Sequence, residues 1–228
     1  MNIAIVVAGG IGSRVSGLNM PKQFAVVNGK KIMEHTLSVF AGCKLIDKII
    51  LVTNEQYLEE TKQVIKNIDK PVSIVVGGST RQQSVYNALT SENFKPDDIV
   101  LIHDCARPLV DEEIIERNIE EAKRCGTAIT AIKVQDSVMR KDESNSISYE
   151  DREKLYKVQT PQTFKYDLIS KAHKKALNDG INDSTDDGQL LKRMGIELRL
   201  VEGKNENFKI TTDIDLLLFE QIINKKKA

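Results

Sequence analysis

Three glycines and two basic side chains lie close together near the start of the chain. The segment AGGIGSR at 8–14 follows a short apolar run, and Lys22 comes eight residues after Arg14. Clustered glycines mark backbone that turns tightly or approaches a ligand closely, and backbone N–H groups in such a loop can surround a phosphate. Two nearby cations suit the charge that develops when the α-phosphate of a nucleotide is attacked. The alternative is that Arg14 and Lys22 are surface ion-pair partners.

This glycine loop departs from two common phosphate-binding patterns. The dinucleotide fingerprint GxGxxG needs a third glycine where the chain has Val15. The P-loop pattern GxxxxGK[ST] needs a lysine after Gly17, where the chain has Leu18. A nicotinamide-dependent dehydrogenase and a P-loop enzyme are therefore both disfavoured.

Two further motifs each follow a predicted strand, GGSTRQQS at 77–84 and HDCARP at 103–108. They should lie at the carboxyl edge of the sheet, where open α/β sheets bind ligands. The first opens a helix and offers free N–H donors, although Thr80 or its neighbour Ser79 could be the N-cap of an ordinary turn. The second places Asp104 where a carboxylate can reach a metal, a ribose hydroxyl or an arginine. His103 has no second ligand at metal-binding spacing, which favours a structural role.

The elements that must position these motifs alternate between apolar runs and segments with helical spacing. Strands are expected at 3–7, 49–52, 72–76 and 99–102, and helices at 31–42, 55–68, 81–92 and 111–124. This alternation predicts an α/β fold with a mostly parallel sheet. Two more apolar segments, 127–134 and 155–164, enclose a charged stretch that is either a flexible loop or a projecting β-arm, because residues 146–149 alternate like a strand. Helices near 165–179 and 185–194 and a last helix from about 212 follow.

Composition bounds the class of protein and its partners. The 228 residues carry 33 basic and 33 acidic side chains, so no global field favours nucleic acid or a membrane surface. Three widely spaced cysteines, Cys43, Cys105 and Cys125, argue against a disulfide framework and suit a reducing cytoplasm. No leader-like or membrane-spanning apolar stretch is present, and Lys225, Lys226 and Lys227 are expected to be a solvated helix end. We expect a cytoplasmic enzyme that binds neither nucleic acid nor membrane.

The motifs together resemble a known family. The order AGGxGxR, PKQ, GGxxRxxS, HDxARP, QTPQxF, a TD pair and N-x-K-[IV]-T is similar to that of the 2-C-methyl-D-erythritol 4-phosphate cytidylyltransferases and related polyol-phosphate cytidylyltransferases. The resemblance covers nearly the whole chain. It implies a Rossmann-like, three-layer, mostly parallel nucleotidyltransferase fold of the glycosyltransferase-A-like kind, with a projecting β-arm. We expect one domain over 1–228, with a dimerisation arm at 135–155 within it.

The resemblance also implies a reaction and its residues. CTP and an alcohol phosphate would give a CDP-alcohol and pyrophosphate, with Mg²⁺ or another divalent cation on the triphosphate. Arg14 and Lys22 would stabilise the transition state, and Asp104 would serve the nucleotide and the metal. The remaining nucleotide contacts would be Ala8, Gly9, Gly10, Gly12, Gly78, Ser79, Arg81 and Ser84.

The alcohol phosphate is an anion and needs its own contacts. By resemblance, Arg152 and Lys209 would position it, with Arg107, Thr160 and Thr185 as further substrate contacts. The residues alone would make Arg152 a solvated arm residue and Lys209 an edge-strand lysine that blocks aggregation. Arg107 could instead fix Asp104. Because the family's arm reaches the neighbouring subunit, Arg152 would complete the partner's pocket in a two-fold homodimer.

The identity of the alcohol phosphate stays open between two readings. AGG in place of AAG, Tyr156 and the STDDGQL segment allow a ribitol 5-phosphate cytidylyltransferase. The spacing around GGSTRQQS and the interval from the TD pair to Lys209 favour the methylerythritol branch. A non-catalytic nucleotide-binding module is disfavoured, because it has no need of a second anion pocket built from Arg152 and Lys209.

Overall fold

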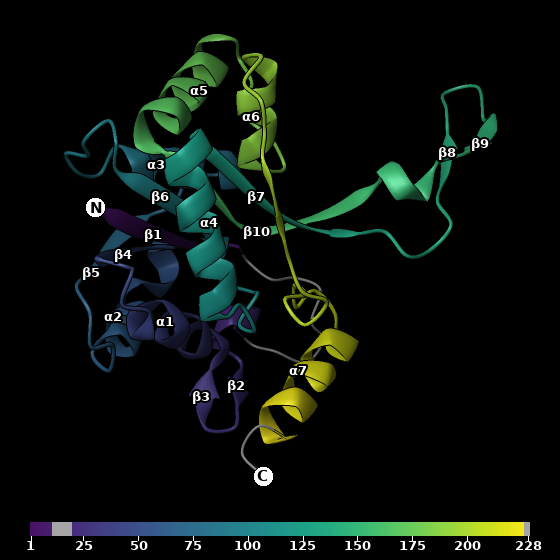
Figure 1. Ribbon diagram of the computed structural model, residues 1–228. Helices are drawn as coiled ribbons and strands as arrows, with labels where there is room; N and C mark the ends of the chain where they lie inside the picture. The colour runs from purple at the N-terminus through teal and green to yellow at the C-terminus, as the bar shows by residue number, and fades with distance from the viewer. Residues whose placement is uncertain (11–19, 226–228) are drawn as a thin grey trace.

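A seven-stranded sheet organises the computed structural model, which describes residues 1–10 and 20–225 (Figure 1). The strand order is β11-β7-β10-β6-β1-β4-β5. In chain order these strands are β1 (Asn2–Val7), β4 (Lys48–Thr53), β5 (Val72–Val76), β6 (Ile99–Asp104), β7 (Thr127–Lys133), β10 (Tyr156–Lys165) and β11 (Leu200–Glu202). All adjacent pairs are parallel except those made by β10, which runs antiparallel to β6 and β7. The predicted mostly parallel sheet is confirmed.

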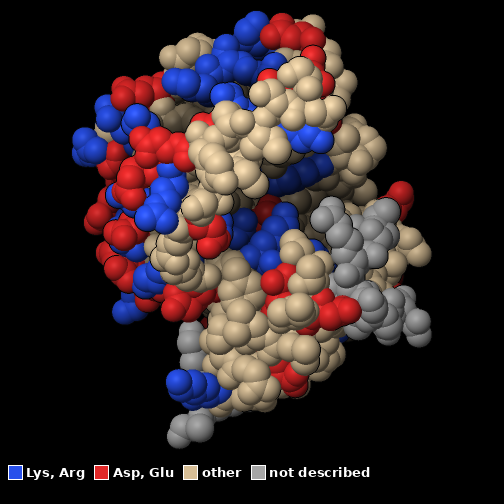
Figure 2. Space-filling model, turned by 90° about the vertical axis from the view of Figure 1, so that its right-hand side faces the viewer, with Lys and Arg blue, Asp and Glu red and all other residues tan. Residues whose placement is uncertain are grey.

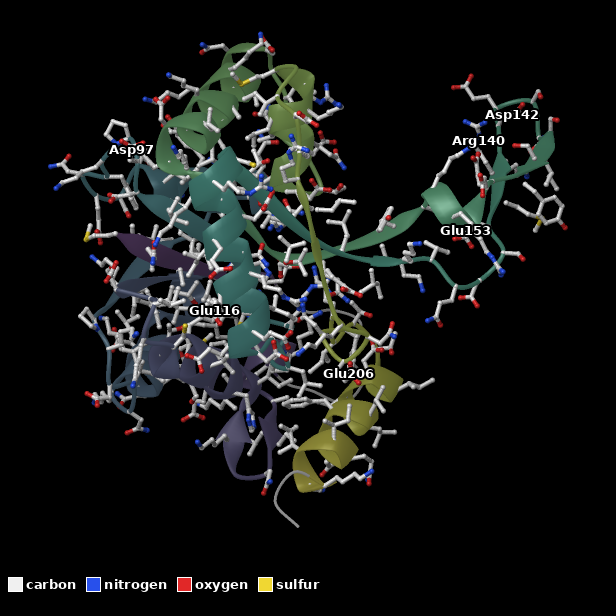
Figure 3. All side chains as sticks on the ribbon, viewed as in Figure 1. Asp97, Glu116, Arg140, Asp142, Glu153 and Glu206 are labelled. Carbon is white, nitrogen blue, oxygen red and sulfur yellow. The ribbon has the colours of Figure 1, made fainter. Side chains whose placement is uncertain are left out.

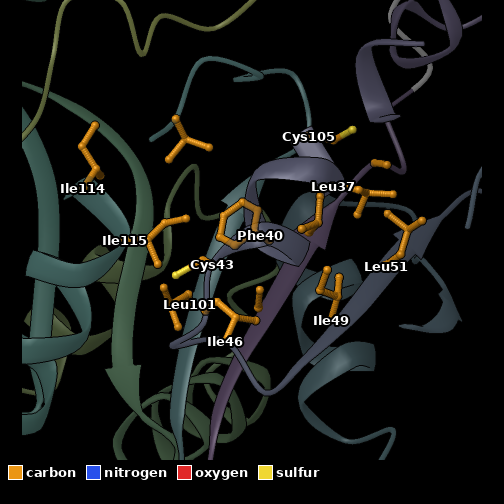
Figure 4. Packing of buried hydrophobic residues seen from close by; sticks show 14 of the residues in the cluster. Leu37, Phe40, Cys43, Ile46, Ile49, Leu51, Leu101, Cys105, Ile114 and Ile115 are labelled. Carbon is orange, nitrogen blue, oxygen red and sulfur yellow. The ribbon is translucent and has the colours of Figure 1, made fainter. Parts of the chain in front are cut away.

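Helices cover both faces of this sheet. They are α1 (Ile32–Gly42), α2 (Leu58–Ile65), α3 (Arg81–Leu89), α4 (Glu112–Cys125), α5 (Tyr166–Asn178), α6 (Asp187–Arg193) and α7 (Asp213–Lys225). Because side chains alternate along a strand, Ala4 and Val6 of β1 join one buried cluster, whereas Ile3 and Ile5 join the other. The first cluster, shown in Figure 4, packs α1, α2 and α4 on the sheet. The second packs α3, α5 and α6 on the opposite face, so the fold has the expected three layers.

A left-handed glycine ends α4 and gives a stability prediction. Gly126 has φ +86°, and a Cβ there would lie 2.7 Å from Leu168 Cδ1. Gly180 also has a positive φ, +72°, but a Cβ there would meet nothing within 4 Å. We expect Gly126→Ala and Gly180→Ala each to lower the free energy of unfolding by about 1–2 kcal/mol from backbone strain, because the methyl group at the end of the Leu168 side chain can move aside. Urea unfolding measures both, and a much larger loss at Gly126 than at Gly180 would mean that Leu168 cannot move.

The charged stretch between β7 and β10 forms a β-arm that projects from the sheet (Figure 1). It consists of β8 (Met139–Lys141), paired antiparallel with β9 (Ile147–Tyr149), and a short 3₁₀ turn at Arg152–Lys154. The strand interpretation of residues 146–149 is therefore confirmed over a flexible loop. On the described arm, Met139, Ile147 and Tyr149 are all exposed apolar side chains.

Several local details differ from the sequence-based expectation. The helix expected at 55–68 divides into a 3₁₀ turn at Glu55–Tyr57 and α2, with Asn54 capping the turn through its side chain. A two-stranded hairpin, β2 (Val26–Val27) and β3 (Lys30–Lys31), was not predicted. Residues 208–211 are irregular, so the interpretation of Lys209 as an edge-strand lysine is wrong. Within the described ranges, no helix is both long and apolar enough to span a bilayer.

Candidate active site

A cavity of about 550 Å³ lies where β1, β4, β5 and β6 end. Figure 2 views the molecule from this side, and basic side chains gather in a hollow near the middle of that face. The cavity is lined by Val7, Ala8, Gly9, Gly10, Lys22, Gln23, Asn54, Gly78, Ser79, Thr80, Arg81, Ser84, Asp104, Cys105, Ala106, Lys209 and Thr211. Parallel strands end at one edge of the sheet, which is why segments far apart in the sequence meet here.

The backbone after β1 forms the first wall of the cavity. Ala8, Gly9 and Gly10 line it, and the amide of Ala8 donates to the carbonyl of Val52 at 2.8 Å. The buried Gln23 donates through Nε2 to the carbonyls of Ala8 at 2.7 Å and Gly10 at 3.0 Å. Sequence analysis gave Gln23 no role, although its place inside the PKQ motif pointed to it.

Two predicted residues of this loop, Gly12 and Arg14, lie outside the described residues, as do Lys226 and Lys227 of the C-terminal lysines. Lys22 lies in a 3₁₀ turn (Lys22–Phe24) and donates through Nζ to the carbonyl of Ile210 at 2.6 Å. It lines the cavity. The cation is thereby held beside the segment that carries Lys209.

The loop between β5 and α3 forms the opposite wall. Thr80 is the N-cap of α3 and accepts from the Gln83 amide at 3.1 Å. Ser84 Oγ accepts from the Gly78 amide at 3.1 Å and donates to the Thr80 carbonyl at 2.9 Å. Ser79 donates through its amide to Gln83 Oε1 at 3.0 Å. Gly78, Ser79 and Ser84 line the cavity, on a loop whose shape Ser84 and Gln83 hold.

Asp104 at the end of β6 is the carboxylate at the centre of the site. Its Oδ1 accepts from Arg81 Nε at 3.1 Å and its Oδ2 from Lys209 Nζ at 2.8 Å. Burial alone would raise the pKa of Asp104, but the adjacent charges of Arg81 and Lys209 outweigh it and hold the pKa well below the usual range. The group is therefore a carboxylate at neutral pH.

His103 lies behind the cavity and is fully buried. Its Nδ1 is 3.1 Å from Thr160 Oγ1 and its Nε2 is 3.1 Å from the Arg107 carbonyl. Burial lowers the pKa of His103 from 6.5 to about 4, so the ring is neutral at pH 7. Both ring nitrogens are bonded within the fold, in keeping with the structural role expected from the sequence.

The lowered pKa of His103 predicts how stability depends on pH. The folded state binds fewer protons at this ring than the unfolded state, so its contribution is complete above pH 6.5 and is lost as the pH falls toward 4. We expect the free energy of unfolding to fall by about 2 kcal/mol between pH 7.5 and 5 on this account. Urea unfolding of wild type and His103→Gln at both pH values measures it. An equally steep fall in the variant would contradict the assignment to His103.

The predicted substrate contacts are not all brought to the cavity. Thr160 is buried, and its Oγ1 accepts from the Asp104 amide at 3.1 Å behind the cavity wall. Arg107 is half-buried and donates through Nη1 to the Asn207 carbonyl at 2.9 Å. Thr185 is exposed and accepts from Gln189 Nε2 at 2.9 Å. Arg152 lies on the arm, where it donates to the Gln135 carbonyl at 3.1 Å.

Residues that sequence analysis did not single out also shape the site. Asn54 and Thr211 line the cavity, and Asn207 donates through Nδ2 to the Thr160 carbonyl at 2.9 Å. Asp187 pairs with Arg81 Nη1 at 2.7 Å. Asn207 is the first residue of the N-x-K-[IV]-T motif, and Asp187 directly follows the TD pair at 185–186, so the sequence pointed to these segments but not to the roles of the two residues.

Comparison with known proteins agrees with this geometry. Residues 2–225 match the sequence model of the family described as 2-C-methyl-D-erythritol 4-phosphate cytidylyltransferase. The chain is 43% identical to the protein of that name from Clostridium acetobutylicum, covering 99% of this chain and 98% of the relative. It is 35% identical to a ribitol-5-phosphate cytidylyltransferase of Streptococcus agalactiae serotype V, covering 100% and 97%.

A solved structure shows the same architecture. The crystal structure of 4-diphosphocytidyl-2C-methyl-D-erythritol synthase from Anaerococcus prevotii superposes with a TM-score of 0.87 at 29% identity, covering 98% of each chain. The sheet order, the glycine loop, the Asp104 site and these matches over the whole chain point the same way. The chain belongs to the 2-C-methyl-D-erythritol 4-phosphate cytidylyltransferase family and is a cytidylyltransferase.

Proposed function

We propose that the protein transfers the cytidylyl group of CTP to 2-C-methyl-D-erythritol 4-phosphate and releases pyrophosphate. The observation that carries this proposal is the cavity in which the glycine backbone, Lys22, Lys209 and the ionised Asp104 come together. Relatives at 41–43% identity that bear this enzyme's name support the choice of substrate. Ala8, Gly9, Gly10 and Gly12 would contact the triphosphate, and Gly78, Ser79, Arg81 and Ser84 would surround the nucleoside.

The proposed reaction is an in-line displacement at the α-phosphorus. A phosphate oxygen of the alcohol phosphate forms the new P–O bond, while the bond to the bridging oxygen breaks and pyrophosphate leaves with the electron pair. The attacking oxygen is already anionic near neutral pH, so a strong general base is not needed. Lys22 and Arg14 would hold the charge that develops on the α-phosphate, because fixed cations stabilise a transition state without reorganisation.

A covalent enzyme intermediate is not part of this mechanism. Cys105 lines the cavity, but burial raises its pKa to about 12, so the thiol is protonated at neutral pH. In this proposal the phosphate oxygen of the substrate is the nucleophile.

We further propose that Asp104 holds a divalent cation, Mg²⁺ in the first instance, together with the CTP phosphates. The described residues contain no group of three or more His, Cys, Asp or Glu that could hold a metal alone. One carboxylate fits Mg²⁺ bound mainly by phosphate oxygens and water. Asp104 accepts one hydrogen bond on each oxygen, which leaves lone pairs for such a contact. The cation would neutralise part of the negative charge on the triphosphate.

The arm supports a two-fold homodimer in which Arg152 serves the partner's pocket. In Figure 3, Glu153, next to Arg152, lies well apart from Glu206, which is in the segment leading to Lys209. Met139 pairs with Tyr149, and Ile147 lies two residues from Tyr149, so the three side chains share one face of the hairpin. A two-stranded hairpin is marginally stable alone, and a second copy would cover this face. In this proposal, 1–228 is one domain and 135–155 its dimerisation arm.

The other substrate contacts and the cellular setting are proposed on narrower grounds. Arg107, Thr160 and Thr185 would act on the alcohol phosphate side, with Lys209 at the cavity and the partner's arm completing the site. A cytoplasmic location is supported by Cys43, Cys105 and Cys125, which are unpaired.

A second candidate is transfer to D-ribitol 5-phosphate, which the ribitol-5-phosphate cytidylyltransferase relative favours. Pyrophosphate release from CTP and Mg²⁺ with each alcohol phosphate in parallel decides between them. We expect 2-C-methyl-D-erythritol 4-phosphate to give the higher kcat/KM. A preference for ribitol 5-phosphate would overturn the substrate assignment and keep the cytidylyl-transfer chemistry. If neither alcohol phosphate gave pyrophosphate release, the non-catalytic nucleotide-binding module would be favoured instead.

A further inference from the structure

A buried carboxylate lies behind Arg81, on the side away from the cavity. Asp187, the first residue of α6, is 1% exposed, and its Oδ2 accepts from Arg81 Nη1 at 2.7 Å. It is absent from the cavity lining. On the other side of the same guanidinium, Nε donates to Asp104 Oδ1 at 3.1 Å. Arg81 thus bridges one carboxylate at the cavity and one in the interior.

The interior end of this bridge is itself held in place. Asp187 Oδ1 is 3.2 Å from Nε2 of His173, a residue of α5 that is 1% exposed. The backbone amides of Asp187 and Gly188 both donate to Gln162 Oε1, at 3.1 and 2.9 Å. The contacts tie the start of α6 to α5 and β10. A guanidinium paired with a carboxylate so anchored has one orientation, because each hydrogen bond removes a rotational freedom.

Arg81 commits two of its five N–H donors to carboxylates, Nε to Asp104 and one on Nη1 to Asp187. Its Nη2 is buried and finds no hydrogen-bond partner among the described residues. Burial alone would lower the pKa of Arg81, but the charges of Asp187 and Asp104 more than offset it and raise the pKa, so the cation is permanent. This permanent cation donates through Nε to one carboxylate and through Nη1 to the other. It therefore orients both carboxylates. The one that lines the cavity is Asp104.

We propose that Asp187, supported by His173, is a positioning residue that fixes Asp104 for nucleotide binding by acting through Arg81. This inference rests on the proposed function, because it assumes that the cavity binds CTP. Arg81 is also the first residue of α3, directly after the loop that carries Gly78 and Ser79. Its anchor on Asp187 therefore fixes both the carboxylate and the start of that helix.

Calorimetric titration with CTP in Mg²⁺ buffer tests the proposal. Asp187→Asn keeps the size and the hydrogen-bonding oxygen but removes the charge that anchors Arg81. We expect the Kd for CTP to rise about tenfold, as for other outer partners of a ligand group. In an Arg81→Met background, the same Asp187→Asn change should leave the Kd within about twofold, because the residue it acts through is gone.

A matched control separates positioning from general stability. Thr163 is buried on β10 and bonds to Asn118 Oδ1 at 3.3 Å, with no contact to the cavity. Thr163→Val should lower the thermal unfolding midpoint and leave the Kd for CTP unchanged. If Asp187→Asn behaves in the same way, or if its effect on the Kd is the same in both backgrounds, the proposal is wrong.

Two further outcomes separate failure of the positioning role from failure of the proposed function. If the wild-type protein binds CTP and Asp187→Asn binds equally well, the positioning role alone fails. If the wild-type protein binds no CTP, the proposed function fails and this inference falls with it. If Asp187→Asn does not fold, His173→Gln is titrated in its place. We expect His173→Gln to raise the Kd for CTP about threefold in the otherwise wild-type protein and not at all in the Arg81→Met background.

Discussion

Replacing Lys22 with methionine lowers kcat for pyrophosphate release by about 10²–10³-fold, while the protein stays folded. Methionine keeps an unbranched side chain as far as the ε-carbon, with sulfur in place of Cδ, and lacks the ammonium group. The expected loss is that of one fixed donor at a developing charge. Lys22 lines the cavity, and its Nζ is held 2.6 Å from the Ile210 carbonyl, so the cation is oriented before the substrate arrives. Steady-state kinetics with CTP and 2-C-methyl-D-erythritol 4-phosphate measure the effect.

The control for this variant is Lys30→Met, which removes an exposed lysine of the β2–β3 hairpin at the same cost in net charge. We expect it to change kcat by less than about twofold. A loss confined to KM in Lys22→Met would mean that Lys22 binds the ground state and the transition state equally, against the role proposed here. A comparable loss of kcat in Lys30→Met would assign the effect to net charge.

Two inactive variants should restore each other when they share a dimer. Arg152→Ala is expected to lower kcat/KM by about 10- to 100-fold, the loss of a charged hydrogen bond to a phosphate. In a mixed dimer with Lys22→Met, the pocket of the Arg152→Ala subunit keeps Lys22 and receives Arg152 from its partner. Random pairing makes half the dimers mixed, each with one intact pocket, so co-expressed variants should recover about a quarter of wild-type activity.

The outcome depends on whether Arg152 acts across the interface. If it served its own pocket, no subunit in the mixture would be complete, and activity would stay at the sum of the two separate variants. Lys154→Ala is the matched control, because Lys154 is an exposed cation in the same 3₁₀ turn and pairs with Asp151 at 3.1 Å. It should keep wild-type activity. Full turnover by a monomeric protein without residues 135–155 would also contradict the dimer proposal.

Much of the fold could be predicted because it follows from the pattern of apolar and polar residues in short segments. The run at 3–7 is apolar at every position and became β1, buried on both faces, with Ile3 and Ile5 toward one layer and Val6 toward the other. Glycines follow this strand directly in the sequence. Asp104 was likewise expected at the end of a strand, because the apolar run at 99–102 comes just before it. The alternation at 146–149 left a flexible loop and a projecting β-arm both open, and the structure has the β-arm.

Other features could not be predicted because they depend on contacts between residues that are far apart in the sequence. Lys209 looked like an edge-strand lysine when judged by its neighbours in sequence, yet it pairs with Asp104, which is 105 residues away. Nothing in the composition of STDDGQL separates Asp187, which is buried against Arg81, from Asp186, which caps α6. The role of a carboxylate depends on which cation lies within about 4 Å and how much water remains, and both depend on packing between elements.

The sequence by itself determined the alternation of strands and helices, the glycine loop after β1 and the presence of cations and a carboxylate at strand ends, because hydrophobic period and backbone freedom are properties of short segments. Only the tertiary structure decided that Asp104 lies between Arg81 and Lys209 and that Gln23 holds the carbonyls of the glycine loop. These pairings join residues from different strands and loops, so they exist only once the sheet has brought its carboxyl edge together.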